Sequence, residues 1–117
     1  MNKCHIKLVI QAIDIFEESN CYLLDGDEII TREIIPEIQP WQQVGDIIQE
    51  YTGIDEQNNL RVNLVGCYNQ SDTFLLYSVI VPKKPNIEKG KWYSLNEVLG
   101  IGNPLIQTLI QETSTYH

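Results

Sequence analysis

The sequence has few of the residues on which nucleophilic catalysis and zinc binding depend. It contains two histidines, His5 and His117, near the two ends of the chain, and three cysteines, Cys4, Cys21 and Cys67, without a Cys-x-x-Cys pair. A structural zinc site usually takes four clustered cysteine or histidine ligands, and a disulfide framework needs paired cysteines, so the sequence argues against both. Neither histidine lies in a pattern typical of a Ser-His-Asp or Cys-His site. We expect the cysteines to be reduced, as in a cytoplasmic protein.

Basic residues and long apolar runs are also scarce. Eight Lys and Arg residues stand against 16 Asp and Glu residues, which gives a formal net charge of −8. This acidity argues against a nucleic-acid partner and against binding to anionic membranes. No run approaches the roughly 20 apolar residues that cross a bilayer, and Gln11 and Asp14 interrupt the first apolar stretch. We therefore expect an acidic, soluble, cytoplasmic protein with no nucleic-acid and no membrane partner.

The size and composition fit one ordered domain over residues 1–117. The chain has 117 residues, of which 43% are hydrophobic, and this is enough for a hydrophobic core at that length. Charged residues make up 21% and include both signs, so the composition is not that of a disordered chain. No internal repeat or second composition marks another domain.

Five apolar segments predict strands, which cover residues 6–16, 21–24, 28–35, 60–68 and 73–81. Asp25-Gly26 is typical of the tight turn that joins the two strands of a hairpin. In the fourth segment, apolar residues alternate with polar ones and predict a single inner face, formed by Leu60, Val62, Leu64, Gly66 and Tyr68. The fifth segment is apolar on both alternating sets, which predicts a central strand covered on both sides.

Helical spacing follows Pro40, where apolar residues recur as one stripe that we expect to be buried in the core, made by Trp41, Val44, Ile47, Ile48 and Tyr51. Gly53 then lies where a left-handed cap would end this helix. Ser94 and Glu97 match a capping box before a short helix at 95–99, and Asn103-Pro104 opens a last helix, whose expected buried face is Leu105, Ile106, Leu109 and Ile110. This order of strands and helices predicts an α/β (α+β) fold, an α/β/α sandwich with a mixed β-sheet.

Two segments resemble those of a known family. The first is Ile48-Gln-Glu-Tyr-Thr-Gly-Ile54, and the second is Glu88-Lys-Gly-Lys-Trp-Tyr-Ser-Leu-Asn-Glu-Val98. They resemble the end of the Nudix hydrolase box, R-E-U-x-E-E-x-G-U with U a bulky aliphatic residue, and the family's late W-x-S-L-x-E-L segment. When Gly53 and Ile54 set the register of the full box, G-x5-E-x7-R-E-U-x-E-E-x-G-U, the matching residues are Ile48, Glu50, Gly53 and Ile54. The positions that depart from it are Arg32, Ile38, Asp46, Ile47 and Tyr51.

The resemblance implies a degenerate Nudix-like fold that lacks most of the catalytic box. It favours a non-catalytic binding or regulatory domain with no metal and no cofactor, which acts through an unknown protein partner or self-association. It further implies a nucleotide-sized cleft beside the helix, with Arg32, Glu33, Trp41 and Glu50 as the ligand-binding residues. That cleft could still accept a nucleotide-like small molecule.

Two alternatives stay open at this point. One is a working pyrophosphohydrolase for nucleoside-diphosphate compounds, in which Asp46 and Glu50 hold Mg²⁺ with help from Glu33 or Glu37. Residues four apart share one helix face, so Asp46 and Glu50 could both contact one ion. The other alternative is that the resemblance is accidental, in which case only the order of strands and helices stands.

Overall fold

The structure, a computed structural model, describes residues 4–14, 19–54, 61–69, 73–81, 87 and 89–114. Phe16, the end of the first predicted strand, lies outside the described residues. Within these ranges the chain forms six strands and three helices, in the order β1 (Cys4–Asp14), β2 (Ser19–Leu24), β3 (Ile30–Glu33), α1 (Pro40–Thr52), β4 (Arg61–Asn69), β5 (Thr73–Val81), β6 (Lys91–Ser94), α2 (Leu95–Ile101) and α3 (Pro104–Ser114).

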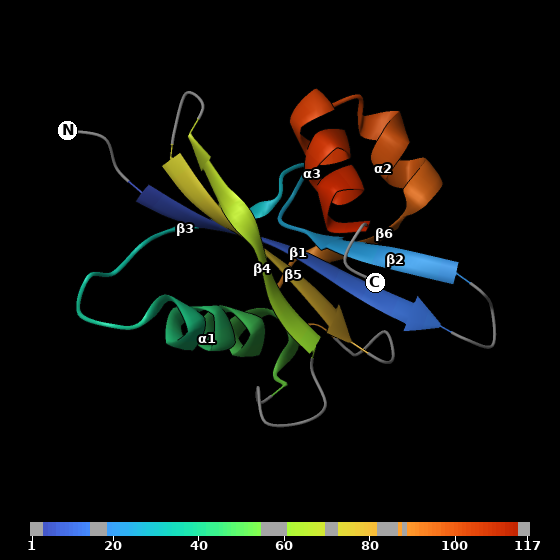
Figure 1. The fold of residues 1–117 in the computed structure, drawn as a ribbon. Coiled ribbons are helices and arrows are strands. Elements are labelled where there is room, and N and C mark those ends of the chain that lie inside the picture. Colours follow the sequence, from blue (N-terminus) through green and yellow to red (C-terminus); the bar gives the residue numbers. More distant parts are fainter. Residues whose placement is uncertain are drawn as a thin grey trace.

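The strands form one mixed sheet between two layers of helix (Figure 1). The strand order is β4-β5-β1-β2-β6, and β3 pairs with β1 beside β2. Only the β1–β5 pairing is parallel among the described strands. One hydrophobic cluster packs α1 on one face of the sheet, and a second cluster packs α2 and α3 on the other. The expected α/β/α layering around a mixed sheet is therefore confirmed.

Helix α1 is held to the sheet by the apolar stripe that its spacing predicts, with one exception. Val44, Ile48 and Tyr51 are buried, and Gly53 ends the helix with φ of 71° while its N–H donates to Gln49. Trp41, however, has 61% of its surface exposed, so its assignment to the core was wrong. Helical periodicity gives the direction in which a side chain points, but not whether the sheet extends far enough to cover the first turn.

Strands β2 and β3 do not form the hairpin that Asp25-Gly26 predicts. The turn itself is present, because the backbone of Asp25 and Glu28 exchanges two hydrogen bonds of 2.9 and 3.2 Å. Both strands nevertheless pair antiparallel with β1, where Leu23 lies opposite Ile10 and Ile30 lies opposite Leu8. β2 and β3 therefore pair one after the other along the same side of β1. The chain keeps its direction after the turn and does not fold back on itself.

Strand β5 lies between β4 and β1, as its apolar character on both faces predicts. Strand β4 departs from prediction, since Val62 and Leu64 are 38% and 53% exposed. A register shift between Leu64 and Gly66 also divides the single inner face that the alternation predicts. An extra residue in one strand moves the following side chains to the other face, so Leu64 and Tyr68 no longer share one face. Tyr68 stacks on Phe74 on the α3 side, with ring centroids 5.3 Å apart.

The C-terminal helices begin and end largely where the sequence places their caps. Ser94 and Glu97 form both hydrogen bonds of the predicted capping box, and Gly102 ends α2 with φ of 73°. In α3, Ile106, Leu109 and Ile110 are buried, whereas Leu105 is 40% exposed against expectation. Of the helices described, none is both long enough and apolar enough to span a bilayer.

Candidate functional site

A polar site lies where the C-terminal half of α1 packs beside β3. Arg32 extends from β3, and its Nη2 donates to Glu50 Oε2 at 2.7 Å and to the Tyr51 hydroxyl at 2.8 Å. Its Nη1 donates to the carbonyl oxygen of Thr31 at 3.0 Å. Three acceptors from two elements therefore hold the guanidinium group in one orientation.

Lys89 supplies a second cation to the same carboxylate oxygen. Its Nζ lies 3.0 Å from Glu50 Oε2, and its backbone N–H donates to the carbonyl oxygen of Tyr51 at 3.3 Å. The next residue, Gly90, has φ of 81°, and a Cβ there would lie 2.7 Å from the carbonyl oxygen of Leu24. Only glycine fits this close approach, so residues 89–90 are packed tightly between the end of α1 and β2.

The Tyr51 hydroxyl connects the cations to a second carboxylate. Tyr51 is fully buried, and its hydroxyl donates to Asp25 Oδ2 at 2.7 Å while it accepts from Arg32. The Arg32 guanidinium also lies 5.3 Å from the centroid of the Tyr51 ring. Asp25, Arg32, Glu50, Tyr51 and Lys89, here called the Arg32 cluster, thus form one connected network with two carboxylates and two cationic groups.

The cluster fixes the charge state of its members. Hydrogen bonds from Arg32 and then Lys89 lower the pKa of Glu50 below its ordinary value. Burial lowers the pKa of Arg32, but its bonds to Glu50 and Tyr51 outweigh this and raise it overall. Burial, together with donation to Asp25, raises the pKa of Tyr51. At neutral pH the Glu50 carboxylate is therefore ionised, Arg32 is charged and the Tyr51 phenol keeps its proton.

The structure brings together only two of the four residues that the sequence assigned to ligand binding. Arg32 and Glu50 are in contact, as expected for one site. Glu33 follows Arg32 directly on β3, so its side chain leaves the opposite face of the sheet. Trp41 precedes Glu50 by nine positions on α1, a separation of about 13 Å along the helix axis. Neither Glu33 nor Trp41 therefore belongs to the cluster.

Sequence reasoning missed three members of the cluster. Tyr51 lies in the buried stripe, as its spacing predicts. A buried phenol also needs a hydrogen-bond partner, and this requirement was the signal in the sequence for a polar neighbour. Asp25 was assigned to a turn, and the same turn directs it toward Tyr51. Lys89 carries no signal in the sequence for its contact, because only the three-dimensional approach of residues 89–90 to α1 brings it to Glu50.

The residues present do not fit a magnesium site. Mg²⁺ takes about six oxygen ligands, including carboxylates that are free to coordinate it. Among the residues that the structure describes, no group of three or more Asp, Glu, His or Cys side chains could hold a metal ion. Asp46 is exposed on α1, and Glu50 is already bound to two cations through one oxygen. A metal ion at Glu50 would have to displace Arg32 and Lys89 or bear their repulsion.

Comparison with solved structures shows that the chain as a whole has a known fold. The NUDIX domain of Shewanella oneidensis NrtR, complexed with ADP ribose, aligns with a TM-score of 0.72 at 12% identity over 99% of this chain and 88% of that one. A chain in the complex between the C-terminal domain of mouse MUTYH and human PCNA aligns with a TM-score of 0.69 at 12% identity over 99% and 90%. The C. elegans Ap4A hydrolase aligns with a TM-score of 0.63 at 15% identity over 99% and 98%. No protein-family model and no curated protein matches the sequence. This chain has a Nudix-like fold.

Proposed function

We propose that this chain is a non-catalytic Nudix-like domain that binds a partner and does not hydrolyse pyrophosphate bonds. The observation that carries the proposal is the double ion pair at Glu50 Oε2, which Arg32 and Lys89 contact at 2.7 and 3.0 Å. In the register of the Nudix box, Glu50 is the one helix glutamate that this sequence retains. Its charge is already compensated from within the chain.

The positions around Glu50 support the same conclusion. A second carboxylate of the box falls on Tyr51, which is buried and holds its hydroxyl between Asp25 and Arg32. Another falls on Ile47, which is buried in the core under α1. Metal-assisted hydrolysis needs several carboxylates around an ion that activates water. Here a phenol and an aliphatic side chain take two of those positions and give structural contacts in their place.

Exposed apolar residues near the start of α1 support protein binding as the role. Trp41 is 61% exposed and Ile35 is 44% exposed. The Ile35 N–H donates to Gln43 Oε1, which places it beside the first turns of the helix. Tryptophan is enriched among the residues that dominate binding energy in protein interfaces. One chain of similar fold was solved in a complex with PCNA, which is consistent with a protein partner for a domain of this shape.

The alternative is a metal-dependent pyrophosphohydrolase that uses Asp46 and Glu50 to hold Mg²⁺. The likeness to an Ap4A hydrolase favours this possibility at the level of the fold, although fold alone does not determine activity. A nucleotide-sized cleft beside α1 would fit either function, and the ADP ribose in the NrtR structure makes a nucleotide-like ligand a candidate.

Hydrolysis separates the two possibilities. The wild-type chain would be incubated with a panel of nucleoside-diphosphate-linked compounds and Mg²⁺ or Mn²⁺, beside Glu50→Gln, Asp46→Asn and Glu112→Gln. Glu112 is an exposed carboxylate on α3 and serves as the matched control. We expect no metal-dependent turnover by any of the four proteins. Turnover that Glu50→Gln and Asp46→Asn abolish, and Glu112→Gln preserves, would overturn the proposal and establish a metal site on α1.

A further inference from the structure

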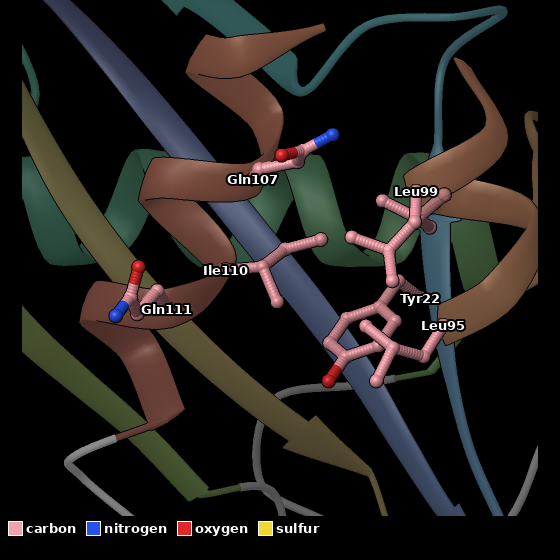
Figure 2. A pocket seen from close by; sticks show the side chains of 7 residues that line it. Tyr22, Leu95, Leu99, Gln107, Ile110 and Gln111 are labelled. Atoms are coloured by element: carbon pink, nitrogen blue, oxygen red, sulfur yellow. The ribbon is translucent and has the colours of Figure 1, made fainter. Parts of the chain in front are cut away.

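A pocket lies on the face of the sheet opposite the Arg32 cluster, between β2, α2 and α3. Its volume is about 340 Å³, which is in the range of small-molecule sites. Figure 2 shows that Leu99 of α2 and Ile110 of α3 point toward each other above the ring of Tyr22, with Leu95 beside that ring. Tyr22 and Ile110 are 5% and 6% exposed, whereas Leu95 and Leu99 are 46% and 48% exposed. Tyr22, which forms the floor of the pocket, and Ile110, which forms its α3 wall, are therefore firmly packed. The α2 wall, formed by Leu95 and Leu99, is open to solvent.

The polar groups of the pocket are all uncharged. The side chains of Gln107 and Gln111 line it from α3, and the Tyr22 hydroxyl lies at the opposite end from Gln107 (Figure 2). Burial, with a smaller contribution from Cys21, raises the pKa of Tyr22, so its hydroxyl stays protonated and can donate at neutral pH. A charged ligand would find no counter-charge among the lining residues, and burying a charge without a partner is strongly unfavourable.

Behind Tyr22 lies a buried amide nitrogen that has no partner among the residues the structure describes. Gln11 on β1 lies directly opposite Tyr22 on β2, so the two side chains share the α2–α3 face of the sheet. Gln11 is only 1% exposed, and its Nε2 has no hydrogen-bond partner in the described part of the chain. Buried donors are almost always paired in native proteins. The unpaired Gln11 Nε2 therefore lies behind Tyr22, and Gln11 itself does not line the pocket.

We propose that this pocket binds a small uncharged molecule with an apolar ring and a carbonyl or similar hydrogen-bond acceptor. The ring packs between Leu95, Leu99 and Ile110 on the Tyr22 floor, and the acceptor takes a hydrogen bond from Gln107 or the Tyr22 hydroxyl. The overall charge of −8 adds long-range repulsion against anions. This site is separate from the Arg32 cluster, and its occupancy does not depend on whether the chain is a hydrolase.

Three ring compounds that differ in charge test the proposal. Benzamide, benzoate and benzylammonium would be titrated separately into ¹⁵N-labelled protein, with amide chemical shifts as the readout. We expect benzamide to shift the signals of Leu95, Leu99 and Ile110, and both charged compounds to bind about tenfold more weakly or worse. Equal binding of a charged compound, or benzamide shifts confined to other parts of the chain, would overturn the proposal.

Matched variants locate the site. Leu99→Glu places a charge at the α2 wall, and Leu64→Glu places the same charge on β4, where Leu64 is 53% exposed. Because both positions are exposed, both variants should fold, which an unchanged spectrum elsewhere confirms. We expect Leu99→Glu and Gln107→Leu to weaken benzamide binding severalfold and Leu64→Glu to leave it unchanged. If neither Leu99→Glu nor Gln107→Leu weakens binding, the pocket is not the site.

Discussion

A single carboxylate oxygen with two cationic partners is the most consequential detail at the scale of residues. Glu50 contacts Arg32 and Lys89 through Oε2, and its side chain remains 38% exposed. Pairs this exposed are screened by water and are worth roughly 0.2–1 kcal/mol each in stability. The contacts are therefore better understood as compensation of the Glu50 charge than as a main source of stability.

Replacing Glu50 tests this compensation through its pH dependence. The pKa of Glu50 is lower in the folded chain than its ordinary value, so its contribution to stability is complete above that ordinary value. The contribution is lost as the pH falls through the folded-state pKa. We expect Glu50→Gln to lower the free energy of unfolding by about 1 kcal/mol or less at pH 7, and the difference to disappear in acid. Urea denaturation of both proteins across pH measures this, and a difference that persists in acid would contradict the electrostatic account.

The residue scale also shows how far the sequence could predict the site. Register against the Nudix box and the position of Arg32 before the helix were enough to expect Arg32 and Glu50 near each other, and the two are in contact. Lys89 could not be placed, since it follows Glu50 by 39 positions and reaches it through a long-range contact. Trp41 was misplaced because helical spacing reports direction only. Contacts between distant segments depend on tertiary packing, which local patterns do not encode.

At the scale of elements, two glycines should respond in opposite directions to the addition of a side chain. Gly90 has φ of 81° and no space for a Cβ, while Gly100 lies within α2, where a Cβ would meet nothing within 4 Å. We expect Gly90→Ala to cost more than about 2 kcal/mol, because it combines a left-handed conformation with a backbone clash. Gly100→Ala should instead stabilise by about 0.5–1 kcal/mol through helix propensity.

Thermal and urea denaturation of the two variants, measured together, give the comparison. Each variant is the control for the other, since both add one methyl group. A Gly90→Ala protein as stable as wild type would mean that residues 89–90 do not pack against β2, and the support of Lys89 in the Arg32 cluster would then fail.

Element boundaries were predicted more accurately than element pairing. The capping box at Ser94 and the glycine cap at Gly53 are local chemistry, and both are confirmed. The sequence did not predict that the strands before and after the Asp25 turn both pair with β1, nor the register shift after Leu64. A turn dipeptide and an alternating pattern each describe a few residues, whereas pairing partners and extra residues in a strand are decided by the neighbouring strand.

At the scale of the whole molecule, the net charge is acidic, yet two cationic side chains, Arg32 and Lys89, meet one carboxylate beside α1. With a formal charge of −8, any salt should relieve some self-repulsion and raise stability slightly. A specific metal site would act differently, because a ligand at roughly a hundred times its Kd stabilises the folded state by about 2.7 kcal/mol. Comparison at equal ionic strength separates these two effects.

The proposed function therefore predicts the response of the melting temperature to magnesium. We expect millimolar Mg²⁺ to change the Tm no more than NaCl at matched ionic strength, because Arg32 and Lys89 already neutralise Glu50. Asp46→Asn should behave as the wild type does in both salts, since Asp46 alone offers a single exposed carboxylate. A rise of several degrees that is specific to Mg²⁺ and lost in Asp46→Asn would contradict this and favour a metal-binding α1. Differential scanning calorimetry gives the Tm directly, and at this chain length a bound ion of useful affinity would produce an easily measured shift.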